Sequence, residues 1–163
     1  MTLRLFNTLS GQLDELAPAD GAELRMYACG PTVYDYGHIG NFRTFLQVDV
    51  LRRFLKLAGM RVRHVMNITD VDDKIIRNAA AAGVPIGEYT PKFVDAFFED
   101  LEALRVERPE SIARATEHID KMVELIQRLA AVDAAYPVGD ARDERGNRAE
   151  DVTDHCDIHV VRE

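Results

Sequence analysis

The stretch CGPTVYDYGHIGN, residues 29–41, decides the fold, because it joins two segments with different hydrophobic periods. Residues 24–29 alternate weakly between apolar and polar side chains and stop at Gly30-Pro31, which predicts a buried strand. Residues 39–58 repeat apolar side chains every three or four positions, which predicts an amphipathic helix that ends at Gly59. The stretch therefore runs from the carboxyl end of a strand to the N-terminus of a helix.

A second strand is predicted further along the chain. Residues 61–68 alternate between polar and apolar side chains with period two and stop at Thr69-Asp70. A strand, a helix and a second strand, with a crossover of about twenty residues, imply two parallel strands that lie side by side. We therefore expect an α/β fold with a Rossmann-like, nucleotide-binding parallel sheet that is followed by helices.

The remaining segments are predicted to be mostly helical. Residues 3–9 are a candidate edge strand or extended arm, and residues 72–82 form an alanine-rich helix closed by Gly83. One further helix is expected to open at Thr90-Pro91 and a last one at Pro109-Glu110, because proline suits the first helical turn. The expected inner face of the last helix consists of Ile112, Ile119, Met122, Val123, Ile126 and Leu129.

Length and composition limit the class of protein. The chain has 163 residues, of which 47% are hydrophobic and 29% charged, as in globular proteins. No apolar run reaches the roughly 20 residues of a membrane span, and residues 1–10 lack the apolar core of a secretory signal. The two cysteines, Cys29 and Cys156, lie far apart and form no disulfide framework. We therefore expect a cytoplasmic protein with no membrane partner.

The net charge of −8 is unevenly distributed along the chain. Residues 140–163 contain eight acidic residues against four arginines and so carry half of it. A chain with this charge is not a general nucleic-acid binder on charge alone. Because the apolar pattern ends after Tyr136, we divide the chain into a Rossmann-like half with trailing helices, residues 1–135, and a divergent acidic tail, residues 136–163.

The stretch 29–41 also carries side chains suited to binding a phosphate group. The N-terminus of a helix offers free N–H groups and the positive end of a dipole. Gly37 and Gly40 allow a nucleotide to approach the backbone. His38 can donate to a phosphate near neutral pH, and Asn41 adds an uncharged donor. The competing interpretation is ordinary turn glycines beside a surface histidine, and the pattern is neither a Walker loop nor a dinucleotide G-x-G-x-x-G.

Two blocks of the sequence resemble a known family. The stretch 29–41, with His38-Ile39-Gly40-Asn41, resembles the first signature of class I aminoacyl-tRNA synthetases. Cys29 and the later block NITDVDDKI, residues 67–75, resemble the cysteinyl-tRNA synthetase family in particular, and the likeness runs from about Leu3 to about Leu129. The resemblance implies a cysteine–tRNA ligase, which converts ATP and cysteine to cysteinyl adenylate and pyrophosphate and then transfers the cysteinyl group to tRNA(Cys).

The resemblance implies a role for each matching position. The ATP site, used with Mg²⁺, consists of His38, Ile39, Gly40 and Asn41. His38 and Asn41 are its catalytic residues, because they stabilise the charge that develops on the phosphates. The pocket for the substrate cysteine is lined by Gly30, Thr32 and Thr69. Cys29 is the first ligand of a Zn²⁺ ion that holds the substrate thiolate and rejects serine without an editing site.

Other interpretations of these positions stay open. Cys29 is alternatively a buried structural thiol at the end of a strand. Either Thr69 or Asp70 caps the helix that follows, and the nearby carboxylates of Asp72 and Asp73 suit its dipole. A divalent-cation site formed by these carboxylates is the alternative, although their spacing is not that of a calcium loop.

Family members are much longer than 163 residues. Their lysine-rich KMSKS-type loop and their remaining zinc ligands are not visible here. The tail holds His155, Cys156 and His159, which are candidate substitute zinc ligands or ordinary residues of a charged segment. Two alternative functions follow: a truncated paralogue that binds a ligand or a protein without aminoacylation, and a cysteine ligase that acts on an aminosugar. A complementing chain that supplies the missing half is a further open possibility.

Overall fold

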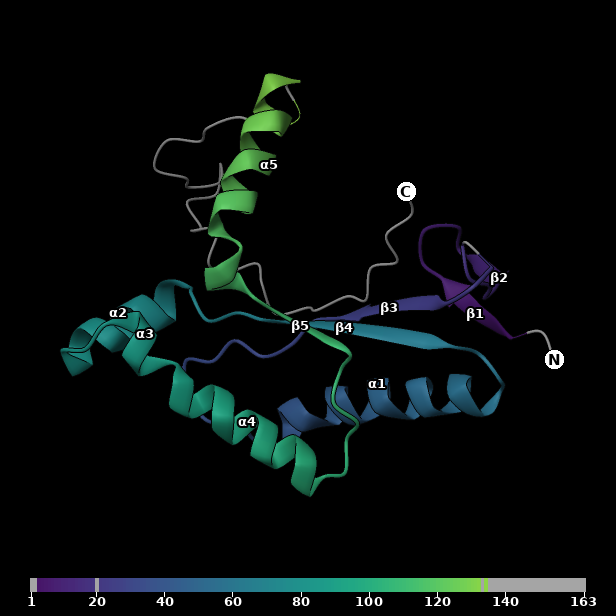
Figure 1. The fold of residues 1–163 in the computed structure, drawn as a ribbon, viewed down its shortest axis with the longest axis horizontal. Helices are drawn as coiled ribbons and strands as arrows, with labels where there is room; N and C mark the ends of the chain where they lie inside the picture. The colour runs from purple at the N-terminus through teal and green to yellow at the C-terminus, as the bar shows by residue number, and fades with distance from the viewer. Residues whose placement is uncertain (1–2, 20, 133, 135–163) are drawn as a thin grey trace.

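The computed structural model describes residues 3–19, 21–132 and 134, which form a parallel sheet, a small hairpin and a set of helices (Figure 1). In chain order the elements are β1 (Arg4–Asn7), β2 (Gln12–Glu15), β3 (Leu24–Ala28), α1 (Ile39–Leu57), β4 (Val62–Ile68), α2 (Asp73–Ala82), α3 (Ile86–Tyr89), α4 (Pro91–Ala103), β5 (Ser111–Arg114), the 3-10 helix η1 (Ala115–Glu117) and α5 (Ile119–Ala131).

The main sheet has three parallel strands in the order β3-β4-β5. β3 pairs with β4 from Leu24, opposite Val62, to Ala28, opposite Met66, and α1 is the crossover between the two strands. β5 pairs with β4 on its other side. The predicted α/β fold with a parallel sheet is confirmed, and so are the strands expected in residues 24–29 and 61–68.

Aromatic side chains attach α1 and α4 to the same face of the sheet (Figure 1). Phe42 and Phe45 of α1 pack with Phe97 of α4 and Met66 of β4, and all four are at most 6% exposed. The ring centroids of Phe45 and Phe97 lie 4.9 Å apart, with the rings inclined by 70°. Because each such buried side chain contributes about 1.5–3 kcal/mol, this cluster fixes the position of α1.

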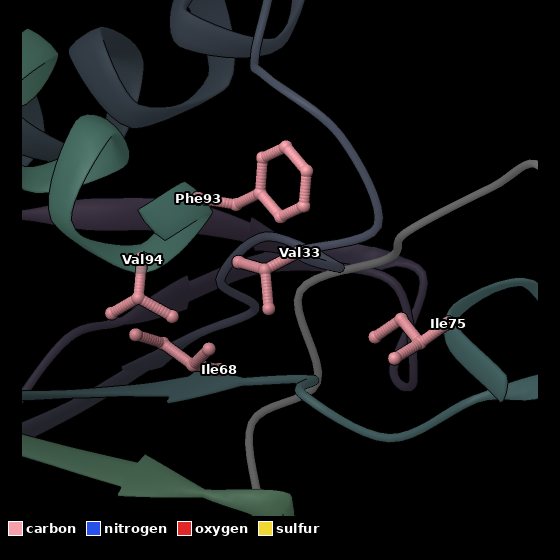
Figure 2. Packing of buried hydrophobic residues seen from close by; sticks show 5 residues of the cluster. All are labelled: Val33, Ile68, Ile75, Phe93 and Val94. Atoms are coloured by element: carbon pink, nitrogen blue, oxygen red, sulfur yellow. The ribbon is translucent and has the colours of Figure 1, made fainter. Parts of the chain in front are cut away.

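A second apolar cluster anchors the stretch 29–41. Val33 packs with Ile68 at the end of β4, with Ile75 of α2, and with Phe93 and Val94 of α4 (Figure 2). Val33 is only 2% exposed, whereas every residue from 34 to 41 is exposed. Val33 is therefore the buried anchor of a loop whose following residues all reach the surface.

The prediction that a helix opens at Pro109-Glu110 is wrong. Residues 111–114 form β5, and α5 begins only at Ile119. Ile112, expected on the inner face of that helix, instead packs against the Val33 cluster from β5. Pairing with β4 decides the outcome, because four residues carry too little local preference to resist the hydrogen bonds that a neighbouring strand offers.

The later part of that predicted helix is confirmed as α5, but its apolar face is not an inner face. Ile119, Met122, Val123, Ile126 and Leu129 are between 38% and 59% exposed. Figure 1 shows α5 directed away from the sheet. The part of the chain that the structure describes therefore leaves this apolar face uncovered.

The N-terminal segment forms a hairpin, where a single edge strand or arm was expected. β1 pairs antiparallel with β2, and Gly11 in the turn has a φ of 69°, which favours glycine.

The domain boundary proposed at residue 135 stays a prediction. The acidic tail, with His155, Cys156 and His159, lies outside the described residues. No helix among the described residues is long and apolar enough to span a membrane.

Candidate functional site at the carboxyl edge of the sheet

The loops that follow β3 and β4 are joined beyond the ends of the strands. Thr32 and Thr69 form an isolated parallel bridge. The Thr69 N–H donates to the Pro31 carbonyl at 3.0 Å, and the Val33 N–H donates to the Thr69 carbonyl at 3.1 Å. Two of the predicted pocket residues, Thr32 and Thr69, are therefore held side by side by the backbone.

Asn67 adds a side-chain link at the same place. Its Oδ1 accepts a hydrogen bond from the Gly30 N–H at 2.9 Å, and its Nδ2 donates to the Thr69 Oγ1 at 3.2 Å. Gly30 packs so closely on β4 that a Cβ there would lie 1.7 Å from the Asn67 carbonyl oxygen. Gly30, Thr32 and Thr69, predicted to line one pocket, are thus brought together. The sequence assigned no role to Asn67, because its two partners become neighbours only in the folded chain.

Cys29 lies between the end of β3 and Gly30, is partly buried and is a free thiol. The residues from 3 to 19, from 21 to 132 and at 134 contain no group of three His, Cys, Asp or Glu side chains that could hold a metal ion. A structural zinc ion takes four ligands, so one thiolate is a fraction of a zinc site. The described residues therefore do not make a complete zinc centre around Cys29.

The other predicted residues lie at the far end of the stretch, where α1 begins. His38 is the N-cap, and its Nδ1 accepts from the Gly40 N–H at 3.1 Å. The Asn41 Oδ1 in turn accepts from the His38 N–H at 3.0 Å. This reciprocal pair is a capping box, with histidine and asparagine in place of the common Ser/Thr and Glu.

The capping box determines which atoms remain for a ligand. Because Nδ1 of His38 is an acceptor, the neutral ring carries its proton on Nε2, and within the described part of the chain this N–H has no acceptor. Gly40 permits the arrangement, since a Cβ at that position would lie 2.9 Å from His38 Cε1. Asn41 was expected to act as a donor, and its oxygen is instead used in the cap, which leaves its Nδ2 amide available.

The start of α1 is also favourable for an anion. Ile39 is 75% exposed, and no acidic side chain occupies the first turn, in contrast to α2 and α5, which carry Asp73 and Asp120 there. A shallow cavity of about 270 Å³ lies beside it, lined by Gly37, Ile39, Phe42, Asp100, Ala103 and Leu104. The end of the stretch therefore combines an open helix N-terminus and an available imidazole N–H, which favour an anion, with an adjoining hollow whose carboxylate, Asp100, disfavours one.

The carboxylates of the block 67–75 are used by the protein itself. Asp72, and not Thr69 or Asp70, is the N-cap of α2, and its Oδ1 accepts from the Ile75 N–H at 2.7 Å. Asp70 is 3% exposed and accepts from both the N–H and the hydroxyl of Thr116, at 2.9 and 2.7 Å. These contacts fasten η1 to the end of β4. The alternative of a divalent-cation site finds no support among the described residues.

Comparison with known proteins places this geometry in context. Residues 15–157 match the family model described as the class I (C) tRNA synthetase catalytic domain. The chain is 60% identical over 140 residues to a cysteine–tRNA ligase of Koribacter versatilis, and this match covers 86% of this chain and 28% of that protein. It is 46% identical over 140 residues to a cysteine–tRNA ligase of Pyrococcus horikoshii, covering 86% and 29%.

A solved structure shares the fold. Methionyl-tRNA synthetase of Mycobacterium tuberculosis, in complex with methionyl-adenylate, superposes with a TM-score of 0.60 and 25% identity. The match covers 68% of this chain and 22% of that one. The chain thus spans less than a third of the length of each of these proteins.

Proposed function

Since the chain belongs to the class I (C) tRNA synthetase catalytic-domain family, we propose that it forms the ATP-binding, N-terminal part of a cysteine–tRNA ligase. The observation that carries the proposal is the capping box of α1, because it leaves the His38 Nε2–H free at an open helix N-terminus. The related synthetase in complex with methionyl-adenylate supports an adenylate-forming reaction. We also propose that the protein is cytoplasmic, because its substrates tRNA and ATP are found there.

In the proposed first step, a carboxylate oxygen of cysteine attacks the α-phosphorus of ATP. The bond from that phosphorus to the bridging oxygen breaks, and pyrophosphate leaves with the electron pair. Negative charge builds up on the phosphate oxygens in the transition state, and preorganised donors that reach them lower the barrier. The His38 Nε2–H, the Asn41 Nδ2 amide and the first N–H groups of α1 are those donors, and Mg²⁺ accompanies the ATP.

In the proposed second step, a ribose hydroxyl at the 3′ end of tRNA(Cys) attacks the adenylate carbonyl, and AMP leaves. The cysteine is held before this step at the other end of the stretch, by Gly30, Thr32 and Thr69. Cys29 supplies one thiolate ligand to Zn²⁺, and the ion when bound fixes the substrate thiol. The other ligands belong to parts of the protein outside the described residues.

Cysteine-dependent exchange of pyrophosphate into ATP tests the proposal. The assay compares the 163-residue chain with a chimera in which residues 1–135 replace the matching segment of the Koribacter versatilis relative, and with that relative unchanged. We expect the chimera to catalyse exchange with cysteine and not with serine. A chimera that folds, as judged by cooperative unfolding, and yet shows no exchange would overturn the proposal.

A binding protein without aminoacylation is the second candidate. It is favoured because the free thiol of Cys29 belongs to no group of three His, Cys, Asp or Glu side chains among the described residues. The same assay separates the two candidates. Saturable ATP binding by an exchange-competent chimera supports the ligase, whereas ATP binding without exchange in both chains supports the binding protein.

A further inference from the structure

Asn67 bridges the two loops that meet at the carboxyl edge of the sheet. It lies on β4, one residue before the end of that strand, and it is partly buried. Its Oδ1 accepts from the Gly30 N–H, 37 positions earlier in the chain, and its Nδ2 donates to the Thr69 Oγ1. One side chain thus contacts a residue of each loop.

The orientation of the Asn67 amide follows from these partners. A backbone N–H can only donate, so the atom that faces Gly30 must be the amide oxygen. The NH₂ group then necessarily faces Thr69. The alternative, flipped amide would set two donors against each other at Gly30 and lose the hydrogen bond of 2.9 Å.

This orientation determines what the Thr69 hydroxyl can do. A hydroxyl that accepts from an amide has its own proton left to donate. Among residues 3–19, 21–132 and 134, no acceptor is found for the Thr69 hydroxyl proton, and Thr69 is only partly buried. Accepting one hydrogen bond also polarises the O–H group and strengthens the bond that it donates. Thr69 is therefore a donor poised at a partly open edge, next to Thr32.

We propose that Asn67 is a positioning residue that makes the Thr69 hydroxyl a hydrogen-bond donor to an anionic atom of the substrate amino acid. The inference rests on the proposed function, because it needs an amino acid seated beside Gly30, Thr32 and Thr69. It goes further by assigning the direction of one hydrogen bond and the residue that sets it. Asn67 itself acts through Thr69 and does not contact the substrate.

Asn67→Asp is the variant that isolates this role. An aspartate keeps an oxygen for the Gly30 N–H but offers no N–H to Thr69, so the Thr69 hydroxyl turns its proton toward the carboxylate. In the exchange-active chimera we expect the KM for cysteine to rise about tenfold, the size of one lost hydrogen bond to a charged group, with the KM for ATP unchanged. Thr69→Ser, which keeps the hydroxyl, should raise the KM for cysteine less than Thr69→Val, which removes it.

The double variant distinguishes this role from a charge effect. In a Thr69→Val background, Asn67→Asp should add less than about a twofold change, because the hydroxyl through which it acts is gone. If Asn67→Asp still raises the KM tenfold in that background, its added charge or a distortion is responsible and the proposal is overturned.

The hydrogen bond can also be tested without activity, on the 163-residue chain. We expect Thr69→Val to shift the NMR signals of the Asn67 side-chain amide, and the matched variant Thr32→Val to leave them in place. Unchanged signals in Thr69→Val would overturn the proposal. If the wild-type chimera shows no exchange, the proposed function fails by itself, and this measurement still decides whether Asn67 orients Thr69.

Discussion

Two polar regions of this chain use their side chains in opposite ways. The first, which we call the α1 clamp, joins α1 to the segment before β5 and consists of Asp49, Arg52, Arg53, Lys56, Glu107 and Glu110. There the Asp49 Oδ1 accepts from the Glu107 N–H at 3.0 Å, and Arg52 donates to the carbonyls of Glu107 and Arg108 and pairs with Glu110. The second is the stretch 29–41, where residues 34–41 are exposed and the His38 Nε2–H is left free.

The two regions therefore have different roles: the clamp stabilises the fold, and the stretch 29–41 has polar groups left for a ligand. In the clamp, Asp49 and Arg52 are 7% and 3% exposed, and their charges are matched by the chain itself. Of their polar atoms, only the Arg52 Nε–H lacks a partner among the described residues, and it is buried away from any ligand. At the carboxyl edge the loop uses only enough hydrogen bonds to hold its shape. Polar groups that are preorganised and not consumed are what a binding site requires. We therefore expect variants in the clamp to change stability and variants in the stretch to change binding.

The largest stability effect is expected for Arg52→Met. It removes a buried guanidinium and leaves the Glu107 and Arg108 carbonyls and Glu110 without their donor, at a cost of about 3 kcal/mol in the free energy of unfolding. Urea unfolding measures the loss. The matched control is Lys56→Met, since Lys56 is 38% exposed and its partners Glu107 and Glu110 are 33% and 38% exposed, so its loss should be much smaller. Equal losses for Arg52→Met and Lys56→Met would contradict the account of the clamp.

A smaller effect is expected for Asp70→Ala. Asp70 lies at the carboxyl edge, but its carboxylate is hydrogen-bonded within the protein, as the clamp residues are. Loss of its two hydrogen bonds to Thr116 should lower the free energy of unfolding by about 2 kcal/mol. Asp72→Ala, which removes only the cap of α2, should cost about 1 kcal/mol. Because both carboxylates are satisfied, millimolar Mg²⁺ or Ca²⁺ should leave the Tm of the wild-type chain unchanged, and a rise in Tm would revive a cation site here.

A further effect, which appears only at low pH, concerns His64, a β4 residue that is 3% exposed beside the clamp. Burial is the main reason that the pKa of His64 lies below its usual 6.5, and the charges of Arg52 and Lys56 lower it further. The carboxylates of Glu110 and Asp49 raise the pKa but do not outweigh these effects. The unfolded chain therefore binds this proton more tightly. Stability should be full above about pH 6.5 and fall as the pH drops below it, by at most about 1.4 kcal/mol per pH unit.

His64→Leu should remove this component, as shown by urea midpoints at pH 7.5, 6.5 and 5.5. Both ring nitrogens of His64 lack a partner in the described structure, so replacing the ring by leucine leaves no other group without its hydrogen bond. We therefore expect equal or greater stability at pH 7.5. His118→Leu, at an exposed histidine, is the control for a histidine-to-leucine change outside the buried interior. A marked loss of stability at pH 7.5 in His64→Leu would show that the ring has a partner after all.

The parts of the fold that have a clear local period could be predicted from the sequence. Residues 24–29 and 61–68 alternate, residues 39–58 repeat helically, and together they determined the parallel pair and its crossover. β5 could not be predicted, because Pro109-Glu110 is also a normal helix start and only pairing with β4 turns residues 111–114 into a strand. The apolar stripe of α5 predicted a buried face, yet the period of a helix does not specify what covers it.

The site shows the same limit. His38 and Asn41 could be proposed from the sequence because their signature is contiguous, and the capping contacts that the structure shows for them span at most three residues. The role proposed here for Asn67 could not be predicted, because it depends on a contact with Gly30, 37 positions away. The prediction that Thr69 or Asp70 caps α2 is wrong for a related reason, since Thr116, which engages Asp70, follows a strand that was not expected.

The central claim is that His38 serves a ligand and not only the helix, and His38→Asn in the chimera tests it most directly. Asparagine keeps a side-chain oxygen that can accept from the Gly40 N–H as an N-cap, but it lacks the Nε2–H. We predict that cysteine-dependent ATP–pyrophosphate exchange falls about 100-fold while the urea unfolding midpoint stays near that of the wild type. Exchange at the wild-type rate, or a loss no greater than the loss of folded protein, would contradict the claim.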